Sequence, residues 1–81
     1  MATYQAITHR SILNNIVTRN RLQVSYSEAQ EGPDNDARWA AVYTLYSVGA
    51  IGRAWATTKI EAKELAARQA IAWLDSRGYR A

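Results

Sequence analysis

The residue types in this chain limit the chemistry it could perform. The sequence contains no cysteine and a single histidine, His9. Without cysteine there is neither a disulfide framework nor a thiolate metal site. One histidine cannot by itself build a zinc site or a histidine-centred catalytic pair, although carboxylates alone could still hold Mg²⁺. We therefore expect a protein that is not an enzyme and that uses no cofactor and no metal.

The best candidate for a functional site is a pair of lysines at a predicted helix start. Thr58 and Glu61 have the spacing of a capping box, in which the two residues satisfy free amides at a helix N-terminus. Lys59 and Lys63 are four residues apart and therefore share one face of that helix. Because free amides and the helix dipole attract anions, Thr58, Lys59 and Lys63 predict a phosphate-binding site. The alternative interpretation is an ordinary solvated lysine pair.

Charge along the chain favours an anionic partner but is interrupted once. Ten basic and seven acidic residues give a net charge of +3. Four of the seven acids, Glu28, Glu31, Asp34 and Asp36, lie in one short stretch. An anionic partner would find two favourable regions separated by an unfavourable loop. A mixed solvated surface also fits these totals.

Hydrophobic periodicity predicts the elements that position these residues. Residues 7–20 have the apolar stripe of an amphipathic helix, and residues 22–30 alternate as a strand that ends in the turn formers of residues 32–36. Residues 39–46 and 50–57 predict a hairpin in which Gly49 takes a positive φ. Residues 62–74 predict a second helix with a close-packing alanine stripe, ended by Gly78. The order predicts an α+β fold, αβββα, with a three-stranded antiparallel sheet and two helices packed on one face.

A two-residue turn would fix the register of the hairpin. It pairs Leu45 with Gly52 and Tyr43 with Ala54 on one side of the sheet. The small residues of this side suit a face on which helices lie close. The other side would face outward and carries Val42 paired with Trp55, and Tyr46 paired with Ile51. A bulge at Gly49 would shift these pairs by one residue.

Length and composition set the outer bounds. Eighty-one residues suit one domain, 1–81, with a core of about 6–77. An apolar share of 48% with three Trp and five Tyr is ordinary for a globular fold. The sequence has no apolar run of roughly 18 residues and no leader-like N-terminus, so we expect an intracellular protein, cytoplasmic or nuclear, with no membrane partner.

These elements together resemble the double-stranded RNA-binding domain family. The resemblance covers nearly the whole chain and is carried by Leu13-Asn14, Gly32-Pro33, Trp39 and, most specifically, the segment from Thr58 to Lys63 followed by Ala66-Ala67. The last segment is similar to the lysine-rich motif at the start of the family's second helix. In spacing, the chain resembles small stand-alone members of the family known from fungi.

The resemblance implies duplex RNA as the partner, recognised by shape over about 16 bp through two minor grooves and the phosphates between them. Besides the lysine pair, the expected RNA contacts are Ser11, Asn15 and Thr18 on the first helix, which suit 2′-hydroxyls, and Asn35 in the loop after Gly32-Pro33. A solvated helix face is the alternative for the first set.

Three departures from the family pattern predict weak RNA binding. Asn15 stands where the family usually has a glutamate, and Asn35, between two aspartates, stands where it has a histidine. Ile60 occupies the place of the second lysine of the motif. One phosphate contact fewer lowers the salt dependence of binding by about 0.9 in logarithmic slope.

A second function is carried by the predicted outer face of the sheet. Trp55, Ile51, Val42 and Tyr46 would form an exposed apolar patch there, beside a third strand that is an edge. This arrangement predicts a relative that does not bind RNA and acts as a homodimer or protein adaptor, through the outer face or the third strand. The alternative for Trp55 is burial under the chain ends.

Overall fold

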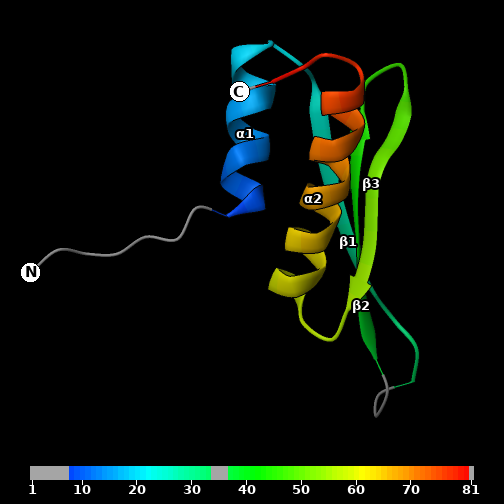
Figure 1. Cartoon of the computed structure of the whole chain (residues 1–81). Helices are drawn as coiled ribbons and strands as arrows, with labels where there is room; N and C mark the ends of the chain where they lie inside the picture. Colours follow the sequence, from blue (N-terminus) through cyan, green and yellow to red (C-terminus); the bar gives the residue numbers. More distant parts are fainter. Residues whose placement is uncertain (1–7, 34–36, 81) are drawn as a thin grey trace, which may run out of the picture.

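The computed structural model describes residues 8–33 and 37–80, which form two helices and three strands (Figure 1). Helix α1 spans His9–Arg19 and helix α2 spans Lys59–Ser76. The strands are β1 (Val24–Glu31), β2 (Arg38–Leu45) and β3 (Gly49–Ala56). The predicted αβββα order is confirmed. Neither helix in this described part is long and apolar enough to cross a membrane.

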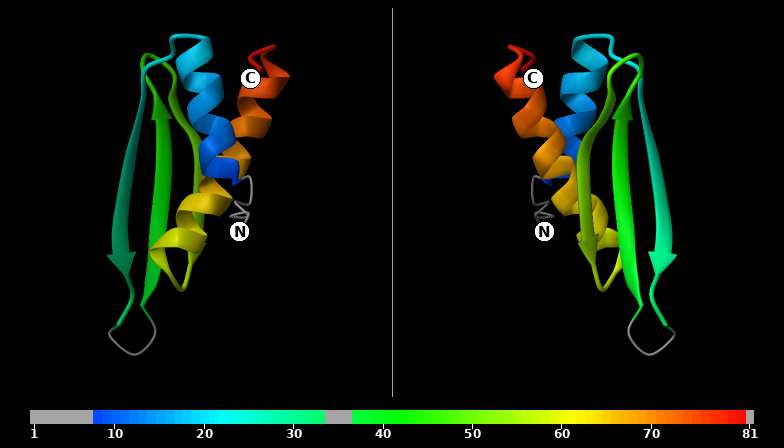
Figure 2. Two further views of the ribbon diagram at one scale, coloured as in Figure 1. Left: turned by 90° about the vertical axis from the view of Figure 1, so that its left-hand side faces the viewer. Right: turned by 90° about the vertical axis from the view of Figure 1, so that its right-hand side faces the viewer.

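The three strands form one antiparallel sheet in the order β1-β2-β3, so β1 and β3 are its edges. Both helices cover the same face, and among the described residues the opposite face carries no helix (Figure 2). The first turn of α2 lies at the end of the molecule where β1 ends and β2 begins. The turn between β2 and β3 lies at the other end, near the last turns of α1.

The predicted register of the β2–β3 hairpin is wrong by two residues. Tyr43 pairs with Gly52 and Val42 with Arg53, whereas the two-residue turn would have paired them with Ala54 and Trp55. The connection is instead a three-residue turn over residues 46–48, closed by a bond from the amide of residue 48 to the carbonyl of residue 45 (3.0 Å). Because strand side chains alternate, a shift of two keeps the residues of this stretch, 39–43 of β2 and 52–56 of β3, on their predicted faces.

An irregularity in the same hairpin moves Ile51 to the other face of the sheet. The register shifts between Tyr43 and Thr44 of β2, so β3 contains one extra residue there, Ile51, which has no partner in β2. The prediction that Ile51 lies on the outer face is therefore wrong: it is 6% exposed and packs in the core under the helices. Gly49 has the predicted positive φ, 118°, and Ser47 also adopts a positive φ, 70°.

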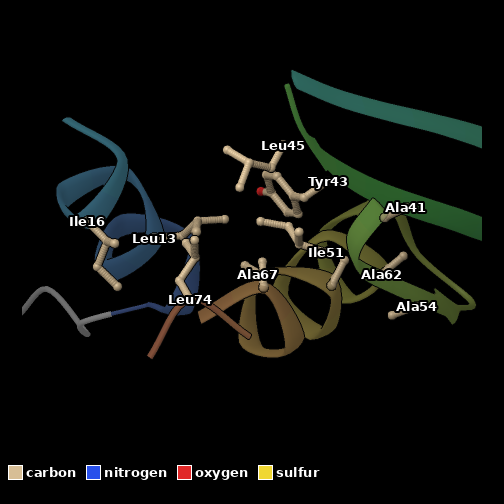
Figure 3. Packing of buried hydrophobic residues seen from close by; sticks show 12 residues of the cluster. Leu13, Ile16, Ala41, Tyr43, Leu45, Ile51, Ala54, Ala62, Ala67 and Leu74 are labelled. Atoms are coloured by element: carbon tan, nitrogen blue, oxygen red, sulfur yellow. The ribbon is translucent and has the colours of Figure 1, made fainter. Parts of the chain in front are cut away.

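Helix α2 packs directly against the sheet at Gly52. A β-carbon placed there would lie 2.2 Å from the carbonyl oxygen of Ala66 and 2.9 Å from the amide nitrogen of Ala70. Only a glycine therefore allows the helix backbone to lie against β3. Figure 3 shows the apolar side chains of both helices and of strands β2 and β3 meeting in this layer. The predicted alanine stripe is confirmed, and its buried members are Ala62, Ala66, Ala67, Ala70 and, at the end, Leu74.

Both helices end in the same hydrogen-bonded turn. In α2 the amides of Gly78 and Tyr79 bond to the carbonyls of Asp75 and Leu74, each at 3.0 Å, and Gly78 has a φ of 87°. This is the Schellman geometry that a glycine favours, as predicted for Gly78. In α1 the same position is taken by Arg21, whose φ is 54°.

Candidate nucleic-acid interface

The N-terminus of α2 has the predicted cap in part. The hydroxyl of Thr58 accepts a hydrogen bond from the amide of Glu61 at 3.2 Å. The carboxylate of Glu61 accepts from the hydroxyl of Thr58 (3.1 Å), where a full capping box would bond it to the Thr58 amide. The helix start is therefore fixed by its own sequence.

The two lysines of α2 lie over aromatic rings of the sheet. The ammonium nitrogen of Lys59 is 4.6 Å from the centroid of the Trp39 ring, and that of Lys63 is 4.5 Å from the centroid of the Tyr26 ring. At such distances a cation is attracted by the negative face of the ring. The two lysines share a face of α2 as predicted, but the rings beneath them come from β2 and β1 and depend on sheet pairing that sequence spacing does not encode.

Residue Ile60 lies between these lysines and points into solvent. Its side chain is 64% exposed. The place of the motif's second lysine is thus on the surface, and it carries no charge.

The predicted polar ridge of α1 lies on the surface, although one member has a structural role. Ser11, Asn15 and Thr18 are all exposed. The hydroxyl of Ser11 donates to the carbonyl of Thr8 (2.9 Å), and the hydroxyl of Thr8 accepts from the Ser11 amide (3.1 Å). Ser11 therefore helps Thr8 to cap α1, while Asn15 and Thr18 keep exposed donors and acceptors on the next turns.

A carboxylate of α2 fixes the start of α1. Glu64 accepts hydrogen bonds from the backbone amides of His9 and Arg10, from the His9 ring (2.9 Å) and from the Arg10 guanidinium (3.1 Å). Burial alone would raise the pKa of Glu64, but these bonds outweigh it and hold the pKa below its usual value. The first turn of α1 contains no acid of its own, so α2 supplies the negative charge that a helix N-terminus favours.

A groove of about 280 Å³ joins α1 to the lysine face of α2. Its polar lining comes from Arg10 and Asn14 of α1, Lys63 of α2, and Tyr26 and Tyr43 of the sheet. Two cations therefore flank a space that opens to solvent. The sequence did not indicate Arg10 and Asn14 as residues of this site. Their spacing from Val17 places all three on one side of α1, but it does not show that this side faces Lys63.

The loop contact is only partly visible. Asn35 lies outside the described residues, together with the two aspartates beside it. Gly32, with a φ of 96°, and Pro33 are exposed at the end of β1. The carboxylate of Glu31 accepts a hydrogen bond from the indole nitrogen of Trp55 at 2.9 Å.

The predicted apolar patch on the outer sheet face is reduced. Trp55 is 48% exposed and Tyr46 is 73% exposed, but Val42 is partly buried and Ile51 belongs to the core. Arg53, opposite Val42, is also exposed on this face.

Comparison with known protein families gives one match. The double-stranded RNA binding motif matches residues 9–74, which include both helices up to Leu74 and all three strands. A search among curated proteins found no match.

Proposed function

Because this chain belongs to the family of the double-stranded RNA binding motif, we propose that it binds duplex RNA by shape, without sequence preference and without catalysis. One observation carries the proposal: Lys59 and Lys63 occupy one face of a capped helix start, and Lys63 shares a groove with Arg10 and Asn14 of the other helix. The kinship with small stand-alone members known from fungi stays a prediction.

The proposed division of work follows the geometry of A-form RNA. Its deep major groove hides the base edges, so phosphates and 2′-hydroxyls are the groups within reach. The ammonium groups of Lys59 and Lys63 suit phosphates, because the helix dipole adds to their charge. Asn15 and Thr18 suit 2′-hydroxyls, because each side chain has a donor and an acceptor. Asn35 remains the proposed contact of the loop.

We expect the binding to be weak. The exposed Ile60 supplies no phosphate contact, and Glu28 and Glu31 are exposed on β1, the strand that leads into the loop proposed to enter the second minor groove. Carboxylates near RNA phosphates repel them. Lower affinity and a shallow salt dependence follow together from these two features.

The test is a fluorescence titration of the protein with a duplex RNA of about 20 bp, at two salt concentrations. Duplex DNA and single-stranded RNA of the same length serve as controls. We expect tighter binding to duplex RNA, and loss of most of it in the double variant Lys59→Ala/Lys63→Ala with an unchanged circular dichroism spectrum. Equal affinity for all three nucleic acids, or full affinity in the double variant, would contradict the proposal.

Self-association is the second candidate, and the exposure of Trp55 favours it. Two features oppose it. The loss of Ile51 to the core shrinks the apolar patch. The side-chain oxygen of Gln69 also accepts a hydrogen bond from the amide of Arg53 (3.2 Å), so one free donor of the β3 edge is already used. Duplex RNA binding is therefore the function that the site supports best.

A further inference from the structure

We propose that Trp39 and Tyr26 are positioning residues for RNA binding: their rings hold the ammonium groups of Lys59 and Lys63 at the positions from which these groups bind phosphates of the duplex. The inference rests on the proposed function, since it concerns how the same two lysines engage RNA. Neither ring needs to touch RNA itself.

The first support is that the same arrangement occurs twice from different elements. Trp39 begins the helix-covered side of β2, and Tyr26 lies on the same side of β1, opposite Tyr43. Each ring lies beneath one lysine, at 4.6 and 4.5 Å. Two lysines one helical turn apart are thus held by two rings of neighbouring strands.

The rings are themselves fixed. The Tyr26 ring contacts the Tyr43 ring with centroids 5.0 Å apart, and its hydroxyl donates to the carboxylate of Glu28 at 3.0 Å. Burial, followed by the bond to Glu28, raises the pKa of Tyr26 to about 12, so the ring stays neutral at ordinary pH. Trp39 is partly buried against the core. A fixed ring can fix the lysine above it.

The physical benefit lies in the flexibility of lysine. Its ammonium group ends a flexible four-carbon stem and has three donors. Attraction to a ring face restricts the stem before RNA arrives but does not use all of the donors. A phosphate can then be bound without ordering the whole side chain first, which is the general advantage of preorganised binding groups.

A third pair of the same kind provides an internal control. The guanidinium of Arg77 lies 4.8 Å from the centroid of the Trp73 ring, at the C-terminal end of α2. That end is remote from the lysines. A variant that loses this pair, Arg77→Gln, removes one positive charge and one cation–ring contact without changing the two lysine positions.

The test compares duplex RNA affinity in ring variants and lysine variants. Tyr26→Leu and Trp39→Leu remove the rings, whereas Tyr26→Phe and Trp39→Phe keep an aromatic face. We expect each leucine variant to bind duplex RNA about two- to fivefold more weakly, as an exposed cation–ring contact implies. The phenylalanine variants and Arg77→Gln should retain most of the affinity at matched salt.

A double-variant cycle separates positioning from a general structural effect. In a Lys63→Gln background, Tyr26→Leu should weaken binding no further, because its lysine is already gone. Equal weakening in both backgrounds would overturn the inference. So would leucine variants that bind as tightly as the wild type, while the proposed function would stand. A wild-type protein that does not bind duplex RNA would contradict both the proposed function and this inference.

A second measurement covers leucine variants that fail to fold. In the wild-type protein, ring currents of Trp39 and Tyr26 should shift the side-chain methylene protons of Lys59 and Lys63 upfield in the NMR spectrum. Tyr26→Phe should preserve the shift at Lys63. Methylene shifts of both lysines at their free-peptide values would overturn the inference without any RNA in the sample.

Discussion

On the single face that it covers, helix α2 packs in two different ways, one over the edge strand β3 and the other toward the opposite edge strand β1. Over β3 the contact is made by backbone and small side chains, because Gly52 allows the carbonyl of Ala66 to lie against the strand. Toward β1 and the start of β2, the aromatic rings of Tyr26 and Trp39 stand between the sheet and the lysines. The small-residue side fixes the distance and rotation of the helix, and the aromatic side supports the charged groups.

This difference separates stability from binding along one helix. Variants on the small-residue side should act on the free energy of unfolding, since any added atom meets backbone. Variants on the aromatic side should act mainly on RNA affinity, since the groups there are exposed or half-buried. The following variants test that division, from the largest expected effect to the smallest.

Gly52→Ala should be the most damaging change. The new methyl group would overlap the backbone of α2 at Ala66 and Ala70. We expect a loss of about 3 kcal/mol or more in the free energy of unfolding, the upper end for an overpacked core. The measurement is denaturant unfolding followed by circular dichroism.

Gly78→Ala is the matched control for this change. Gly78 has a φ of 87°, and a methyl group added at this position would meet only open space. Backbone strain alone should cost about 1–2 kcal/mol. Equal losses at Gly52 and Gly78 would show that close packing on β3 is not what sets the stability.

Glu64→Gln should weaken the contact between the two helices. The charged acceptor for His9 and Arg10 is lost, and we expect a cost of about 1–3 kcal/mol, the range of hydrogen bonds to charged groups. Unfolding at several pH values measures it.

The pH dependence of this contact has a definite sign. Because the folded state lowers the pKa of Glu64, its contribution is fully present above the ordinary value of 4.5 and is lost as the pH falls through the lower folded value. Glu64→Gln should therefore show a flatter loss of stability in acid than the wild type. If Glu64→Gln loses stability in acid as steeply as the wild type, other carboxyl groups are responsible for the acid dependence.

Ile60→Lys should strengthen RNA binding with little effect on stability. The side chain is 64% exposed next to Lys59, so a lysine there adds a phosphate contact and raises the salt slope by about 0.9. Leu65→Lys adds the same charge at a position 43% exposed on the β3 side of α2. If both variants gain the same RNA affinity, the gain comes from the added net charge and not from a specific phosphate contact at position 60.

Trp55→Ala should have a small effect on folding. The side chain is 48% exposed, and its bond to Glu31 is on the surface, so we expect a loss of about 1 kcal/mol. Light scattering over a concentration series tests self-association in parallel. A concentration-dependent wild-type dimer that Trp55→Ala converts to a folded monomer would establish the second candidate function; a wild-type monomer at high micromolar concentration would end it.

The sequence alone determined the parts that depend on neighbours along the chain. The cap of Thr58, the alanine stripe and the end of α2 at Gly78 follow from spacing within one or two turns, and all are present. The spacing of Lys59 and Lys63 likewise placed them on one face of the helix. These features form from local hydrogen bonds and helical geometry, so spacing along the chain was enough to predict them.

The tertiary structure decided what depends on pairing between distant segments. A turn of three residues instead of two shifted the β2–β3 register, and one inserted residue moved Ile51 from the predicted surface into the core. The rings beneath the lysines and the bonds of Glu64 to α1 join segments that are far apart in the sequence. Register is chosen by the fit of the whole helix layer against the sheet, and this fit is a property of all the elements together.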